Sequence, residues 1–403
     1  MEGGSKEGLS LDRALWPENR KGVTMPGQEG TVSEEILERL RSRIGPKRRL
    51  KDTFNELATK EAIRKFADGI GDPNLLWCDE EYSKRTRYGS LVAPFSWLYS
   101  VFVGWITLEI PGLDMMPAGA DWEFHRPVRV GDKITVDHAY KDLDVKRGGS
   151  LIIENHEELY HNQIGELVAK TRSWSIGTKS VTGQAARAQD IQLPHPWSEE
   201  ELRKIENEIL SEPIRGANVR YWENIEVGEE LPPVVKGPLG LTDMVAYLIG
   251  ASPVRFTAHG NTLRLFRDHP RLNFRDPETS SPERIEASHF NRVTTRAMGM
   301  KTGFSFGGQS HCWVIHLLTN WMGDDGWLRR SSVQYRGIIN FSDVVWCRGK
   351  VTKKYVDENG EHCVDIETSV VNQRGEAVVP GNSTVILPSE EKKIWPLDRR
   401  LSG

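Results

Sequence analysis

Residues 160–176, YHNQIGELVAKTRSWSI, are echoed near the C-terminus by residues 370–387, VVNQRGEAVVPGNSTVIL. The two stretches share Asn-Gln-x-Gly-Glu, which starts at Asn162 and again at Asn372. A run of alternating polar and apolar residues lies on each side of both copies, which is typical of β-strands with one buried face. Asn-Gln-x-Gly fits a tight turn between two strands. Each copy therefore predicts a long antiparallel hairpin.

A second pair of segments repeats at almost the same distance. Residues 121–136, DWEFHRPVRVGDKITV, match residues 332–347, SVQYRGIINFSDVVWC, with Asp132 over Asp343. An apolar stretch precedes each, APFSWLYSVFVGW from Ala93 and GGQSHCWVIHLLTNWMG from Gly307. Two separate matches at nearly equal offsets indicate a tandem duplication. Each half should contain a polar loop, a long apolar helix and then several strands.

A helix that is apolar nearly all round must be buried on most sides, and a curved antiparallel sheet can supply that burial. We therefore predict an α+β fold of the tandem double-hotdog type, in which two antiparallel sheets each wrap around a long apolar helix. Edge strands of the two halves can pair into one continuous sheet, which would also cover one edge of each half.

The same patterns divide the chain into five regions. Residues 1–50 are expected to be a mobile tail and a short helix from Ser33, residues 51–177 the N-terminal hotdog, and residues 220–390 the C-terminal hotdog. Residues 178–219 form a linker with a charged helix that starts after Ser198, and residues 391–403 form a tail. The 403-residue length is ample for two cores.

Composition excludes several classes of function. The net charge of −4 shows no basic excess, so we expect no nucleic-acid partner. No stretch has about 18 consecutive apolar residues, and the first 30 lack the apolar core of a signal peptide, so we expect a cytoplasmic protein without a membrane partner. The four cysteines form no CxxC pair, and no metal-ligand spacing or nucleotide-binding loop occurs. We predict no cofactor and no metal.

Residues 66–98, FADGIGDPNLLWCDEEYSKRTRYGSLVAPFSWL, resemble the signature of the MaoC-like dehydratases, the (R)-specific 2-enoyl-CoA hydratase group. That signature is Gly-Asp-x-Asn-Pro-Leu-His-x-Asp, followed by a Pro-containing turn into the hotdog helix. Residues 126–134, RPVRVGDKI, resemble the strand that comes next. The resemblance covers about residues 55–177 and, with more divergence, residues 220–388.

The resemblance implies addition or removal of water at the 2,3-position of an acyl-CoA thioester. An aspartate and a histidine act on one water molecule, and amides at the start of the hotdog helix hold the thioester oxygen. Asp72 falls on the catalytic aspartate and Asn74 on the neighbouring amide of the signature. Trp77 stands where the catalytic histidine is expected, and indole cannot exchange a proton at neutral pH. The N-terminal half alone holds half of a catalytic pair.

The second half can be aligned with the signature in two ways. Counting forward from residue 242 places His259 on the catalytic histidine but Val254 on the aspartate. Counting back from the second apolar helix places Glu286 on the histidine and Gly307 at the helix start. Neither alignment gives an intact pair. We name His259 as the candidate acid, Trp77 and Glu286 as substrate-lining candidates, and the amides near Ala93 and Gly307 as oxyanion donors.

Three functions remain open at this point. The first is an enoyl-CoA hydratase or 3-hydroxyacyl-CoA dehydratase in which Asp72 is the base. The second is a non-catalytic acyl-CoA-binding protein or partner subunit of a hydratase complex. The third is a hotdog thioesterase, which would release free thiol. We expect a homodimer, or a hetero-complex with another hotdog protein.

Overall fold

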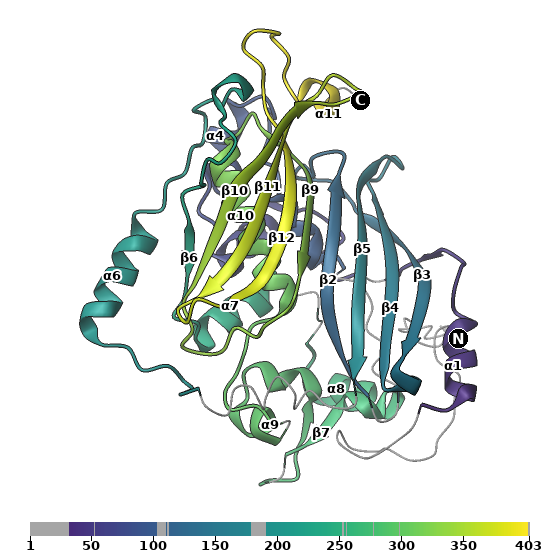
Figure 1. Cartoon of the computed structure of the whole chain (residues 1–403). Coiled ribbons are helices and arrows are strands. Elements are labelled where there is room, and N and C mark those ends of the chain that lie inside the picture. The colour runs from purple at the N-terminus through teal and green to yellow at the C-terminus, as the bar shows by residue number, and fades with distance from the viewer. Residues whose placement is uncertain are drawn as a thin grey trace, which may run out of the picture.

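The structure, a computed structural model, describes residues 32–401 except 52, 103–109, 111–112, 179–190, 252–253, 255, 277 and 298. Ten strands form one sheet in the order β1-β3-β4-β5-β2-β9-β12-β11-β10-β6, and every pairing between neighbouring strands is antiparallel. The first five strands of this order come from the N-terminal half and the last five from the C-terminal half (Figure 1). This arrangement confirms the predicted double hotdog and the pairing of its two sheets.

The N-terminal half supplies β1 (Arg48–Arg49), β2 (Asp114–Phe124), β3 (Thr135–Lys146), β4 (Leu151–His161) and β5 (Leu167–Thr178). The C-terminal half supplies β6 (Val234–Lys236), β9 (Trp327–Gln334), β10 (Val345–Val356), β11 (His362–Asn372) and β12 (Ala377–Ile386). A separate small hairpin joins β7 (Asn273–Arg275) to β8 (Pro282–Arg284).

The described α-helices are α1 (Glu34–Arg41), α2 (Lys60–Ile70), α3 (Leu75–Cys78), α4 (Glu80–Lys84), α6 (Glu199–Leu210), α7 (Leu241–Gly250), α8 (His259–Asp268), α9 (Arg292–Ala297), α10 (Gly307–Met322) and α11 (Asp398–Leu401). Short 3-10 helices are η1 (Phe95–Ser100), η2 (Arg147–Gly149), η3 (Trp222–Asn224), η4 (Pro270–Leu272) and η5 (Ile285–His289). No helix among these described segments is both long and apolar enough to cross a membrane.

The repeated turn is built identically in the two halves. Asn162 accepts the backbone amide of Glu166 and donates to the Glu166 carboxylate, and Asn372 does the same with Glu376. The following glutamines, Gln163 and Gln373, then donate to the repeated aspartates, at 3.0 Å from Asp132 and 2.7 Å from Asp343. The repeat found in the sequence is therefore a repeated hydrogen-bond network, which supports a duplicated fold.

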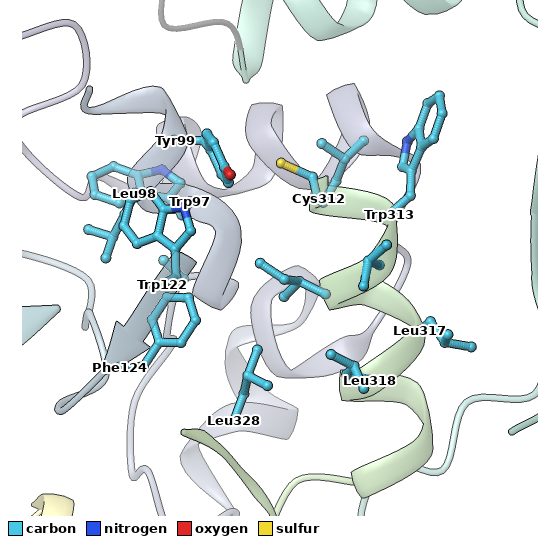
Figure 2. Packing of buried hydrophobic residues seen from close by; sticks show 14 of the residues in the cluster. Trp97, Leu98, Tyr99, Trp122, Phe124, Cys312, Trp313, Leu317, Leu318 and Leu328 are labelled. Carbon is cyan, nitrogen blue, oxygen red and sulfur yellow. The ribbon is translucent and has the colours of Figure 1, made fainter. Parts of the chain in front are cut away.

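The two apolar helices differ. The C-terminal one is α10, whose 16 residues from Gly307 are buried from the second position onward. From Ala93, where a long helix is expected, the structure instead describes the 3-10 helix η1, which ends at Ser100, and residues 103–109 lie outside the described chain. Residues of η1 and β2 face α10 across one shared core, as Trp97, Trp122 and Leu318 show in Figure 2.

Two further contacts place the loop that follows α2. Helices α2 and α7 pack directly against each other, and Gly69 and Gly250 lie at their contact, where a Cβ on either would strike the opposite backbone. Gly71 ends α2 in the left-handed conformation, with φ of 65°. The chain therefore leaves α2 sharply, and Asp72 enters the interior between the two halves.

Candidate active site at the junction of the two halves

Asp72 lies in a tight loop between α2 and α3. Its amide donates to Ala67 O at 2.9 Å, and its Oδ1 accepts the amide of Asn74 at 3.2 Å. The side chain of Asn74 caps α3 by accepting the Leu76 amide at 2.9 Å. Both side chains are almost completely buried. Asn74 thus shapes the loop, and its backbone amide holds Oδ1 of Asp72 in place.

The histidine beside Asp72 is His316, in the middle of α10. Its Nε2 lies 3.5 Å from Asp72 Oδ1, although 244 residues separate the two in sequence. The same Nε2 lies 2.7 Å from Oε1 of Glu212, which follows α6 in the connection between the halves. Both the Asp72 and the His316 side chains are about 1% exposed or less, whereas Glu212 is 10% exposed. The structure thus brings together one residue from each half and one from the connection.

Lys236, on edge strand β6, completes the charged group. Its Nζ donates to Gly71 O at 2.6 Å, directly before Asp72. Lys236 lies close enough to Asp72 and Glu212 for its charge to act on both. Burial lowers the pKa of Lys236, and the two carboxylates oppose that effect. Lys236 therefore fixes the Asp72 loop and offsets part of its negative charge.

The pKa values of Asp72 and Glu212 are shifted in opposite directions. Burial raises the pKa of Asp72 above its ordinary value, and the charges of His316 and Lys236 oppose this without cancelling it. Burial also disfavours ionisation of Glu212, but His316, Lys236 and the amide of Asn320 outweigh it, so the pKa of Glu212 lies below its ordinary value. Two acids whose pKa values differ in this way are suited to acid–base chemistry.

The other predicted site residues lie elsewhere. His259 is the first residue of α8 and is exposed. It is not among the groups that shift the pKa of Asp72. Glu286, on η5, forms a two-pronged ion pair with Arg284. Ala93 already donates its amide to Val128 O at 2.8 Å, so it is not free to hold a thioester oxygen, contrary to expectation. Gly307 does begin α10, and the ring of Tyr335 packs over it.

Trp77 fills the place that the sequence signature assigns to the catalytic histidine. Its indole is 2% exposed and lines a cavity of about 20 Å³, together with Ala93, Phe95 and Arg126. That volume accommodates about one water molecule rather than an acyl group. In the N-terminal half, Trp77 thus lines a cavity too small for an acyl group, while Asp72 meets a histidine from the other half.

The sequence reasoning missed His316, Glu212 and Lys236. A signal for His316 exists in α10, where Cys312, His316 and Asn320 stand four residues apart and place polar atoms on one face of a helix that is buried almost throughout. Nothing in the local sequence of Glu212 or Lys236 distinguishes them from surface charges.

A second buried histidine of α10 also connects the halves. His311 Nδ1 lies 2.7 Å from the hydroxyl of Tyr99 in η1, and its Nε2 lies 2.9 Å from Ser331 Oγ in β9. Burial lowers the pKa of His311 to about 3, so the ring is neutral at physiological pH. Because both ring nitrogens have partners, His311 is structural. Among the described residues, no group of three or more acidic, histidine or cysteine side chains is arranged to hold a metal.

Comparison with known proteins finds relatives of the N-terminal half. Residues 48–171 match the family model of the FAS1-like dehydratase domain region. A UPF0336 protein of Parafrankia sp. is 32% identical over 118 residues, which are 28% of this chain and 77% of that protein. The chain belongs to the UPF0336 family, and its residues 48–171 match a dehydratase domain. A UPF0336 protein of Streptomyces avermitilis is 28% identical over 116 residues, 27% of this chain and 76% of the relative.

Solved structures of MaoC-like dehydratases share the fold over most of the chain. A MaoC-like dehydratase superposes with a TM-score of 0.58 at 15% identity and covers 86% of this chain and 99% of its own. A MaoC domain dehydratase from Chloroflexus aurantiacus gives a TM-score of 0.53 at 14% identity, covering 86% and 96%. At these identities the likeness supports the double-hotdog fold alone. The reaction has to be inferred from the residues of the site.

Proposed function

We propose that this protein is a hydro-lyase that adds water to, or removes it from, the 2,3-position of an acyl-CoA thioester. The observation that carries the proposal is the 3.5 Å approach of Asp72 Oδ1 to His316 Nε2. It supplies the acid–base pair that the sequence signature lacks at Trp77. The pair forms only when both halves are folded together.

In the hydration direction, Asp72 accepts a proton from water, and the resulting hydroxide adds to the β-carbon. The electrons of the double bond move onto the thioester, and the α-carbon then takes a proton from His316. The raised pKa of Asp72 suits a base, because general bases work best when their pKa lies near the working pH. The proton on Asp72 returns to His316 across their short separation, which restores the starting state.

The test measures loss of enoyl-thioester absorbance on a panel of trans-2-enoyl-CoAs, with the wild type and Asp72→Asn. We expect hydration by the wild type and at least a ~100-fold lower rate in the variant, the scale of losing an acid–base group. A thiol assay run in parallel detects thioester hydrolysis. Folded wild-type protein with no hydration of any member of the panel would contradict the proposal.

One observation favours a second function, binding of an acyl-CoA or a partner hotdog without catalysis. Asp72 and His316 are almost fully buried, and neither the cavity beside Trp77 nor a larger one of about 330 Å³ near Arg87 and Trp395 is lined by them. A substrate needs an opening near Glu212 to reach the pair. Acyl-CoA binding without turnover, or co-purification of a second hotdog chain, would favour this function.

A further inference from the structure

Glu212 is held in place by the C-terminal turns of α10. The segment that follows it is attached to this helix: the Arg215 amide donates to Asn320 O at 3.3 Å, and Arg215 Nε donates to Trp321 O at 3.0 Å. Asp324 then donates its amide to Gly216 O at 3.0 Å. The connection between the halves is therefore anchored to the helix that carries His316.

The Glu212 carboxylate itself contacts two residues of that helix. Oε1 accepts Nδ2 of Asn320 at 2.7 Å and lies 2.7 Å from His316 Nε2. His316 and Asn320 are one turn apart, so they present both groups to the same oxygen. Neither ring nitrogen of His316 makes a hydrogen bond of standard geometry to the described residues. Glu212 Oε1, at 2.7 Å from Nε2, lies closer to the ring than Asp72 Oδ1 does at 3.5 Å, so it is the contact best placed to fix the orientation of the ring.

The charges around His316 favour the ionised form of the Glu212 carboxyl group. Asp72, Lys236 and Glu212 act on one another through their charges, and the thiols of Cys312 and Cys347 lie within reach of this group. Asp72 resists ionisation because of its burial, whereas Glu212 ionises readily. An anion at contact distance favours the charged form of a histidine.

We propose that Glu212 is a positioning residue, which holds the His316 ring and keeps a proton on it for delivery to the α-carbon. This role rests on the proposed hydro-lyase function. Because Glu212 lies in the connection between the halves, this connection would contribute a residue to the proposed site. The family match ends at residue 171, before Glu212, so the matched part of a single hotdog contains the Asp72 loop but no counterpart of this carboxylate.

The first arm of the test compares Glu212→Gln with the wild type across pH. We expect kcat to fall ~10-fold or more with KM little changed, and the alkaline limb of the rate profile, which reports the protonated acid, to move to lower pH by about one unit or more. Glu212→Asp should restore part of the rate. Glu206→Gln, an exposed residue of α6, serves as the matched control and should behave as the wild type.

The second arm needs no turnover. Nitrogen-15 NMR of the histidine rings, with His316→Gln used to assign the signal, measures the protonated fraction of His316 at fixed pH. We expect that fraction to fall in Glu212→Gln. If the wild type shows no hydration but this fraction falls, the hydro-lyase proposal fails while the coupling of Glu212 to His316 stands. An unchanged fraction together with an unmoved alkaline limb overturns the inference.

Discussion

The carboxyl group of Asp72 has a cost for stability that follows from its burial. In the unfolded chain it ionises near its ordinary pKa of 3.8, but in the folded protein the pKa is raised. Between these two values the folded state binds more protons than the unfolded state, so stability falls as pH rises through this window. Active-site residues often carry such a cost in return for function.

Asp72→Asn removes the ionisation while keeping the oxygen that accepts the Asn74 amide. We therefore expect the variant to become progressively more stable than the wild type as pH rises from 4 toward neutrality. Urea unfolding at several pH values measures the difference. Asp68→Asn, four residues earlier and exposed on α2, should show no such trend. A difference between Asp72→Asn and wild type that stays constant with pH would contradict the raised pKa.

At the scale of single residues, the sequence predicted the Asp72–Asn74 loop because its information is local. The Asx turn at Asp72 and the helix cap at Asn74 depend only on neighbours a few positions away in GDPN. The partner of Asp72 was not predictable in this way. His259 was chosen by counting along the chain, whereas His316 reaches Asp72 only through the packing of α10 between the two halves.

Among the elements, α2 and α7 depend on glycine for their close approach. A Cβ on Gly250 would lie about 3 Å or less from the backbone of Lys65 and Phe66. We expect Gly250→Ala to destabilise the protein by about 1–3 kcal/mol, the usual cost of overpacking, although alanine is the better helix former. Urea unfolding measures the free energy.

The control for this substitution is Gly260→Ala in α8. There the nearest atom to a new Cβ is Arg264 Nη1, at 3.7 Å, which is ordinary contact. This variant should be as stable as the wild type or slightly more so. If the two alanine variants unfold alike, close packing of α2 on α7 is not what holds the Asp72 loop in place.

The elements themselves were predicted unevenly. The hairpins around Asn162 and Asn372 and the helix from Gly307 have strong periodic patterns, and the structure contains them. Where a helix is expected from Ala93, the structure has the 3-10 helix η1. The amide of Ala93 itself donates to Val128 O. An apolar run predicts burial well, but it does not distinguish an α-helix from a shorter turn when the tertiary contacts decide.

For the whole molecule, duplication brings together Asp72 and His316, which come from different halves. The sequence predicted the two copies and their shared sheet because the Asn-Gln turns and the aspartates they bind are repeated. It could not predict which loop of one copy would meet which helix of the other. That register depends on the β2–β9 pairing and on the core common to η1 and α10.

The most direct measurement is the rate of enoyl-CoA hydration by His316→Gln beside His259→Gln. We predict that the hydration rate of His316→Gln falls at least ~100-fold, as that of Asp72→Asn does, because each substitution removes one member of the acid–base pair. His259→Gln, on the exposed start of α8, should keep the wild-type rate. Full activity in His316→Gln, with loss of activity in His259→Gln, would contradict a site assembled from Asp72 and His316.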